Sequence, residues 1–563
     1  MLPILGLPTR RSYPRKTARL AVVLVAAALG GACATSKPPA EAPRSARYED
    51  LVAFFRDWRA FQRPALVSGV PDYSARAMAA QNSALAQWQS RLAAIDPSGW
   101  PIARQADWHV VRAEMNGLDF DHRVLRPWAD NPAFYVTVFG DESDQPAREG
   151  PFAAGAVELW AYAFPLSAKD AAAISPGIRA IPGLLGQAEV NLTGNQKDLW
   201  THAPAAIRRQ SSVLADLASR LTNDLAALRT DVLRAKDATD AFATWVEAQA
   251  PSKTAPSGVG VNNYTWYLRH VQLVPYTWQD QVTLMERELA RAHALLAAEE
   301  TRNESLPPQT IVASADEHSR RFADAVTEYM AFLERRNILT VKPYMDAALR
   351  ARVGRFRPGP REFFTEVDYR DPVVMRTHGF HWFDKATMAR EPPPSPVRAG
   401  PLLYNIFDSR TEGLATGWEE WMMQAGLFDS RPRSRELIYI LVAQRAARAL
   451  GELRMHANLL TLEQAAAFAA ANTPRGWLSL QGTLVRREQH LYLQQPGYGT
   501  SYLIGKAQIE RLMAIRRQQL GDRFTLKGFV DEFLAAGLIP MSLLTWELTG
   551  QLPEDVRQML SVP

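Results

Sequence analysis

Cysteine is almost absent from this sequence, because Cys33 is the only one among 563 residues. A single cysteine cannot form an intrachain disulfide, so the fold has to be stabilised by packing. Long apolar runs are scarce as well. The run from Leu20 to Leu29 is the only clear one, and it is too short to span a bilayer as a mature helix.

A strong charge of either sign is also missing. The formal net charge is +5, and the segment Arg10 to Arg19 contributes five positive charges on its own. The rest of the chain is therefore close to neutral, and it has no basic stripe with interleaved aromatic residues. Both features argue against a nucleic-acid partner.

Several common catalytic motifs are missing too. The sequence has no GxSxG elbow, no Walker A pattern and no GxGxxG fingerprint. None of its ten histidines is followed by glutamate, so the HExxH motif of many zinc peptidases is absent. Because its single cysteine lies in an export signal, thiol catalysis is excluded as well.

The N-terminus has the order of a bacterial export signal. A basic segment precedes the apolar run, and three small residues at 30–32 lead into Cys33. This pattern resembles a lipobox, in which the cysteine is lipidated and becomes the first mature residue. We predict a lipoprotein signal peptide at residues 1–32 and lipidation at Cys33. The alternative is an ordinary cleaved signal with a leftover cysteine.

The segment after the cysteine predicts how the protein is held. Residues 33–47 are rich in Pro, Ala and Ser and predict a flexible tether. A lipidated protein of this kind is exported and anchored to a bacterial membrane with its body on the periplasmic face. Ala34 is not the aspartate associated with inner-membrane retention, so the outer membrane is the expected site.

The remaining chain predicts a mainly α fold. Helical apolar spacing dominates residues 48–250, and Pro176 and Pro182 predict helix starts there. A Gly-, Pro- and Ser-rich break at 251–262 separates this N-terminal helical region from a second one at 251–563. We expect a large multi-helix domain in which the second region forms a deep central cleft.

Two stretches in the C-terminal half carry polar stripes along otherwise apolar helices. Their spacing places each stripe on one helix face, and the residues are Glu412, Thr416 and Glu419 on the first and Arg445, Arg448, Glu452 and His456 on the second. Buried charges are costly unless they are paired or bind a metal. The stripes therefore predict either a structural salt-bridge seam or the wall of an active site.

Ordered motifs in this half point to a family. They are 412–419, 445–456, 496–505, Leu520-Gly521 with Phe524, and Gly537 with Pro540. Residues from about 255 to 550 resemble on these grounds the bacterial family DUF885, often described as gluzincin-like zinc metallopeptidases. The resemblance implies a helical metallopeptidase fold around a cleft. Leu503 and Val530 depart from the family, which has lysine and histidine there.

The metal-binding motif of the family, HE..PGHH, is also absent. In its place stand His378 and His381, at i and i+3 and about thirty residues before Glu412. This spacing is compatible with a zinc site made of these three residues, with Asp384 or Glu419 as base. The alternative is a turn whose histidines bond to the backbone or stack on neighbouring aromatic rings.

The resemblance assigns further roles by position. His456 and Tyr502 would face the reacting carbonyl, and Arg448 and Glu419 complete the candidate catalytic set. The first hypothesis is a membrane-tethered periplasmic hydrolase, peptidase-like and metal-dependent, with zinc as the expected ion and small peptide-like substrates. The second is a catalytically inactive binding or scaffold lipoprotein of the same family, and a metal-free hydrolase is the third.

Overall fold

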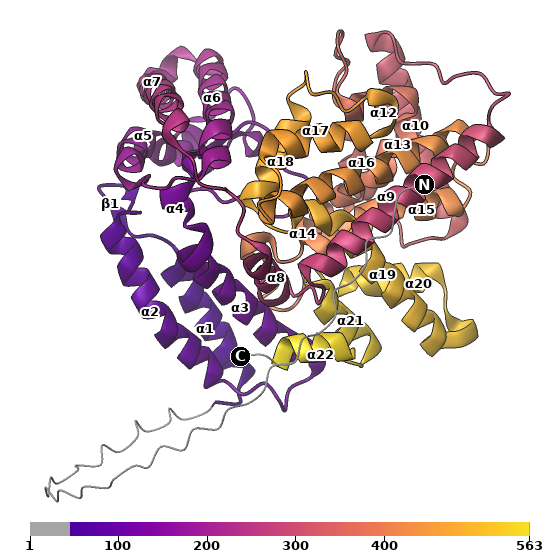
Figure 1. Ribbon diagram of the computed structural model, residues 1–563, viewed down its shortest axis with the longest axis horizontal. Helices are drawn as coiled ribbons and strands as arrows, with labels where there is room; N and C mark the ends of the chain where they lie inside the picture. The colour runs from indigo at the N-terminus through magenta and orange to yellow at the C-terminus, as the bar shows by residue number, and fades with distance from the viewer. Residues whose placement is uncertain (1–44, 562–563) are drawn as a thin grey trace, which may run out of the picture. The chain divides into compact units, whose positions relative to one another are not determined.

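The computed structural model of the chain describes residues 45–561, which form one compact unit (Figure 1). The predicted signal peptide at 1–32, the lipidation residue Cys33 and most of the predicted tether lie outside the described residues. The last tether residues, 45–47, are held against the body. Ser45 bonds to Ala94 and Asp96 through its backbone, and the Ala46 carbonyl accepts a bond from Trp100.

The predicted mainly α fold is confirmed. The first half contains α1 (Tyr48–Gln62), α2 (Ala75–Ala93), α3 (Ile102–Phe120), α4 (Pro127–Asp130), α5 (Ala168–Asn191), α6 (Lys197–Arg220) and α7 (Ala226–Gln249). Strand pairing among the described residues is limited to two short pairs. They are antiparallel β1 (Leu66–Val67) with β2 (Val70–Pro71) and parallel β3 (Val138–Phe139) with β4 (Val157–Glu158).

The second half continues with helices of very different length. They are α8 (Val261–His270), α9 (Trp278–Arg302), α10 (Ala315–Arg336), α11 (Met345–Arg350), α12 (Phe363–Arg370), α13 (Pro372–His378), α14 (Phe380–Arg390), α15 (Asp408–Gln424), α16 (Arg433–His456), α17 (Leu462–Asn472), α18 (Leu484–Gln494), α19 (Tyr498–Leu520), α20 (Leu526–Ala535), α21 (Met541–Thr549) and α22 (Glu554–Ser561). No described helix is long and apolar enough to serve as a membrane span.

Local sequence signals explain many helix starts. Thr277 and Asp280 form a reciprocal capping box at α9, and the Asp371 side chain caps α13, whose first residue is Pro372. The prediction that Pro176 and Pro182 start helices is wrong, because α5 runs through both. Burial of its apolar face against α7 outweighs the two backbone hydrogen bonds that these prolines remove.

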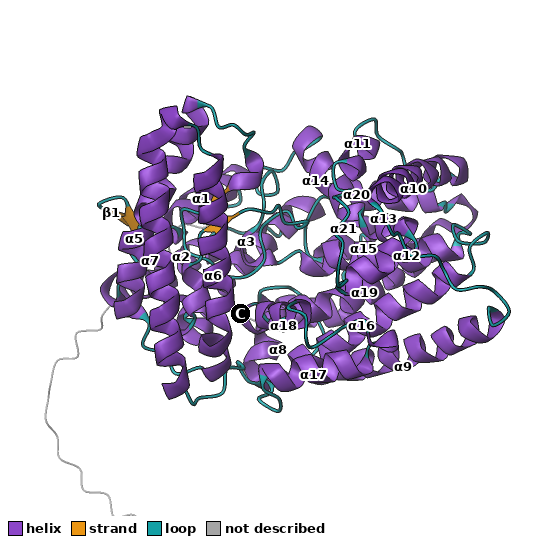
Figure 2. Ribbon diagram, turned by 90° about the horizontal axis from the view of Figure 1, so that it is seen from above, coloured by secondary structure: helices purple, strands orange, loops and turns teal. Residues whose placement is uncertain are grey.

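Two large hydrophobic clusters organise the body. The first joins α1–α3 to helices of the second half, so residues 48–120 share a core with the C-terminal region. The second is formed within residues 73–246, mainly by α5, α6 and α7, which lie side by side in Figure 2. The break predicted at 251–262 follows directly on the end of α7.

The closest backbone approach in the second half joins α15 to α19. A Cβ built on Gly505 would lie 1.7 Å from the Ser409 carbonyl oxygen, and one on Gly413 would lie 2.4 Å from the Gly505 Cα. Only glycine leaves room for two helix backbones at such distances. Both glycines belong to the sequence motifs described above, so these motifs record a packing requirement.

We predict that Gly505→Ala lowers the free energy of unfolding by about 3 kcal/mol or more, because a backbone carbonyl cannot move aside as a side chain can. Gly186→Ala in α5 is the matched control. A Cβ there meets nothing within 4 Å, so the free energy of unfolding should rise by about 0.4–1 kcal/mol. Urea unfolding followed by circular dichroism measures both, and similar effects in the two variants would contradict the account.

Candidate functional site

The two histidines of the HxxH pattern lie at a junction between helices. His378 ends α13 and His381 lies in the first turn of α14, with Gly379 between them. They therefore do not share one continuous helix face, as a simple i, i+3 argument assumes. The turn nevertheless brings their rings together, with centroids 5.0 Å apart.

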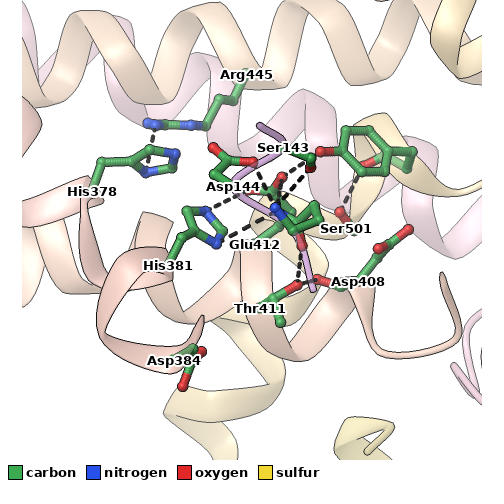
Figure 3. Close-up of polar contacts among 12 residues, drawn as sticks. Ser143, Asp144, His378, His381, Asp384, Asp408, Thr411, Glu412, Arg445 and Ser501 are labelled. Carbon is green, nitrogen blue, oxygen red and sulfur yellow. Dashed lines mark hydrogen bonds and ion pairs between the residues drawn. The ribbon is translucent and has the colours of Figure 1, made fainter. Parts of the chain in front are cut away.

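A third side chain reaches the same place from the first half of the chain. Asp144 lies in the segment between β3 and β4, and one ligand atom each of Asp144, His378 and His381 lies within 4.8 Å of the others (Figure 3). The sequence analysis missed Asp144. Asp144 lies more than 230 positions before these histidines and meets them only through a tertiary contact. No sequence spacing could therefore have indicated it.

Glu412, the third predicted ligand, lies on α15 next to His381. Its Oε2 is 3.3 Å from the His381 Nε2, and both atoms are buried without a hydrogen bond of normal geometry. The other carboxylate oxygen accepts bonds from the Gln145 amide at 2.8 Å and the Tyr498 hydroxyl at 2.6 Å. The structure thus gathers His378, His381 and Glu412, and adds Asp144.

The electrostatics of the His381–Glu412 pair favour the ionised forms. Burial alone would raise the pKa of Glu412, but the positive charges of His381 and His378 outweigh it and hold this pKa at about 2. Burial would likewise lower the pKa of His381. The negative charges of Asp144 and Glu412 prevail and raise it to about 9.

Glu419, a predicted catalytic residue, forms a bidentate ion pair with one arginine. Its two oxygens accept bonds from the Arg445 guanidinium at 2.7 Å each, and its Oε1 lies 3.0 Å from the His378 Nδ1. Arg445 and Glu419 are both fully buried. Burial would raise the pKa of Glu419, but the charge of Arg445 lowers it. This pair matches the predicted salt-bridge seam, and it also positions His378.

Asp384, the alternative base, makes an ion pair of its own. Its carboxylate binds Arg410 of α15, and both side chains are buried. Arg448 is likewise paired with Glu488 of α18. Tyr502 lies beside both arginines of the stripe, with Arg445 and Arg448 at 5.7 and 5.3 Å from its ring centre. Tyr502 therefore lies beside the Glu419–Arg445 ion pair, and Arg448 lies beside Tyr502.

His456 does not join this group. Its Nε2 donates to the Tyr492 carbonyl at 3.0 Å, and its ring lies 5.1 Å from that of Tyr264. Burial lowers the pKa of His456 to about 4, so the ring is neutral. None of the described residues that contact His456 is a predicted metal ligand. The stripe on α16 therefore divides, with Arg445 and Arg448 facing α15 and His456 facing α8.

Glu452 lies on the same side as His456. It accepts bonds from the Tyr264 hydroxyl at 2.9 Å and from the backbone amides of Gly497 and Thr500 at 2.5 and 3.0 Å. It therefore fixes the start of α19 against α8 and α16. Burial raises the pKa of Glu452 to about 8, although these donors oppose the rise.

Two further carboxyl groups border the cluster around Glu412. The Tyr498 hydroxyl lies 3.3 Å from Glu149, and Asp408 accepts a bond from Gln495 at 2.6 Å. Burial raises the pKa of Glu149 to about 7 and that of Asp408 well above its usual range. The region is thus rich in carboxyl groups, which favours cation binding.

Part of the C-terminal half of the chain matches a known protein family. Residues 405–548 match the family model described as bacterial protein of unknown function (DUF885). Over this segment the chain is similar to DUF885. The DUF885 segment supplies Glu412, Glu419 and the helices α15, α16 and α19, whereas Asp144, His378 and His381 lie before it. No curated protein matches the chain.

Two solved structures share the fold of the chain. A protein from Shewanella oneidensis, described as a lipoprotein of unknown function, matches with a TM-score of 0.65 at 15% identity and covers 90% of this chain and 100% of its own. A protein from Colwellia psychrerythraea, described as a lipoprotein, matches with a TM-score of 0.60 at 14% identity and covers 92% and 99%. Neither comparison addresses the resemblance to gluzincins.

The Glu419–Arg445 ion pair predicts strong coupling between two substitutions. Glu419→Leu strands a buried guanidinium and should lower the free energy of unfolding by about 3–5 kcal/mol. The double variant Glu419→Leu/Arg445→Leu removes both charges, so its cost should fall short of the sum of the single costs by about 1–3 kcal/mol. Chelator-treated protein is used for urea unfolding. Leucine substitutions in the exposed pair Arg208–Glu247 are the control and should be nearly additive, and additive costs at the buried pair would contradict the argument.

The raised pKa of Glu452 predicts how the free energy of unfolding changes with pH. The folded state keeps its proton up to about pH 8, whereas the unfolded chain loses it near 4.5, so the contribution of Glu452 to stability falls as pH rises between these values. Glu452→Gln should cost about 1–3 kcal/mol at pH 5, because one backbone donor loses its acceptor. This cost should shrink at pH 8, since glutamine does not titrate. Glu463→Gln, whose bond with Arg486 lowers the pKa of the carboxyl, should show a constant effect. A cost that is constant or grows for Glu452→Gln would refute the prediction.

Proposed function

We propose that the mature protein is a lipid-anchored periplasmic hydrolase that holds a divalent metal ion, with zinc as the expected one, and acts on peptide-like substrates. The observation that carries this proposal is the convergence of Asp144, His378 and His381, together with Glu412, whose Oε2 lies 3.3 Å from the His381 Nε2. The lipoprotein description of both structural neighbours is consistent with an exported, lipid-anchored protein. Cys33, the only cysteine of the chain, is the residue that would carry the lipid.

The residues present fit a zinc ion. Imidazole nitrogens and carboxylate oxygens are its usual ligands beside thiolates. The His381 Nε2 and the Glu412 Oε2 are buried and lack a hydrogen bond of normal geometry. Their separation of 3.3 Å equals the distance of ~3.3 Å between two ligands with bonds of ~2.0–2.1 Å in a tetrahedral site.

The neighbouring residues have supporting roles. The His378 Nδ1 lies 3.0 Å from the Glu419 carboxylate and 3.2 Å from the Arg445 guanidinium, which fixes the ring and leaves the other nitrogen for a metal. Gln145 and Tyr498 donate to Glu412 and hold its carboxylate in place. Burial raises the pKa of Glu149, beyond Tyr498, to about 7, which suits this carboxyl to exchange protons with a substrate. The chemistry that a divalent ion supplies when bound is Lewis-acid polarisation of a carbonyl group.

A specific observation favours a second candidate function, a binding lipoprotein without catalysis. Both predicted bases, Glu419 and Asp384, are engaged in buried ion pairs, and His456 lies apart from the cluster. In this alternative the carboxyl-rich cluster is architecture or a metal store. The two candidates differ in peptide hydrolysis, so one protein preparation distinguishes them.

The test is metal analysis of protein purified without chelator and reloaded with zinc. We expect about one zinc ion per chain and hydrolysis of a mixed fluorogenic peptide library. His381→Ala should lose the metal and reduce hydrolysis at least 100-fold. The control His293→Ala removes an exposed histidine of α9 that bonds to Asn472 and should retain both properties.

The possible outcomes decide between the candidates. Zinc that remains bound in His381→Ala, or a wild-type protein that cannot be loaded, contradicts the metal site. Stoichiometric zinc without hydrolysis supports the binding protein and refutes the hydrolase.

A further inference from the structure

A second concave site lies away from the His378–His381 cluster. It is a cavity of about 680 Å³, bounded mainly by residues from α1 to β4 and closed by Tyr267 of α8 and the turn at 402–404. None of the predicted metal or catalytic residues lines it. The prediction placed the cleft within residues 251–563, whereas this cavity is lined largely by the first half of the chain. Its volume is in the range of small-molecule sites.

Most of the cavity wall is aromatic or aliphatic. Aromatic rings are contributed by Tyr73, Trp128, Phe134, Tyr267 and Tyr404. The exposed Leu66 of β1 also lines it, which places an apolar rim at its opening. A wall and rim of this kind favour a ligand with a substantial apolar part.

Two pieces of unusual backbone geometry lie at or next to residues of this cavity wall. A single π-helical turn, Asp121–Leu125, interrupts the end of α3, and the following Arg126 has φ of 40°. Tyr404 has φ of 59°, and its ring packs directly on Gly117, where a Cβ would lie 2.4 Å away. Left-handed conformations of such residues cost about 1–3 kcal/mol each and cluster at ligand sites. π-helical turns do so as well.

Asp121 is the polar group that distinguishes the cavity. Its carboxylate makes no hydrogen bond and no ion pair with any residue in the described range 45–561. Burial raises its pKa to about 8. Three tyrosines stand close enough for its charge to raise the pKa of each hydroxyl, namely Tyr73, Tyr267 and Tyr404.

The other charged lining residues do not neutralise Asp121. Arg63 is exposed at the outer end of the wall. Arg148 lies over the Phe139 ring at 4.1 Å and is bonded to Glu158. The buried Tyr404 hydroxyl makes no hydrogen bond of normal geometry within the described residues, although the Gln62 amide lies near it. A carboxylate without a cation, surrounded by aromatic rings, therefore faces an apolar cavity.

We propose that this cavity binds an organic cation with an apolar tail, whose ammonium group pairs with Asp121 among the tyrosine rings. An ammonium ion supplies the positive partner that the Asp121 carboxylate does not have, and the faces of the aromatic rings attract this ion further. The tail replaces water along the apolar wall. The site is independent of the metal site proposed above, so either proposal can fail without the other.

The test uses decyltrimethylammonium, a probe of fixed charge, with decanoate as the analogue of opposite charge. Isothermal titration calorimetry at pH 8 should show the cation binding at least tenfold more tightly than decanoate. Asp121→Asn should weaken cation binding at least tenfold and leave decanoate binding unchanged. Asp119→Asn is the matched control, because Asp119 lies on the same helix and pairs with Arg123. This variant should bind as the wild type does.

A second measurement needs no variant. Affinity for the fixed-charge probe should rise at least fivefold from pH 6 to pH 9, as Asp121 ionises, and this rise should be absent in Asp121→Asn. Decanoate binding as tight as that of the cation would overturn the proposal and point to Arg63 instead. Equal losses in the Asp121 and Asp119 variants, or no change with pH, would overturn it as well.

Discussion

The contact between α15 and α19 at Gly413 and Gly505 is the constraint on which the polar centre depends. Because the two backbones approach so closely at these residues, the first half of α19 lies against the first half of α15. Tyr498 can then donate to Glu412, and Glu452 of α16 can hold the amides at the start of α19. A wider spacing would leave Glu412 buried without its phenol donor, a state that costs far more than the loss of one contact.

The cost of buried charge explains the arrangement around this contact. Five acidic groups lie near this contact and are accommodated in four ways: a bidentate guanidinium at Glu419, imidazolium at Glu412, backbone amides at Glu452, and protonation favoured by burial at Asp408 and Glu149. The first two of these keep a carboxylate ionised, whereas burial favours the protonated form at Glu452, Asp408 and Glu149. The seam and the candidate site are therefore parts of one network, in which Glu419 stabilises α15 against α16 and also orients His378.

Much of this could be predicted from residue pattern. Helical periodicity gave the mainly α fold, and the spacing of Glu412, Glu419 and Arg445 placed them on facing helices, as the structure confirms. Other features depend on tertiary contacts that no local pattern encodes. Asp144 reaches the histidines from a loop of the first half. His456 shares a helix with Arg445 but faces α8, because three helical turns along a buried helix lead to a different neighbour.

The segment between β3 and β4 connects the two concave regions of the protein. Asp144 and Gln145 belong to the metal cluster, whereas Ala147, Arg148 and Gly150 line the cavity. Gln495 joins them from the other side, since its amide oxygen accepts from Gly150 and its nitrogen donates to Asp408. The segment is held to the second half chiefly by side-chain hydrogen bonds rather than by a helix of its own, so a shift there costs less than one in α15 or α19. One short stretch of chain thus contributes residues to both the metal cluster and the cavity wall.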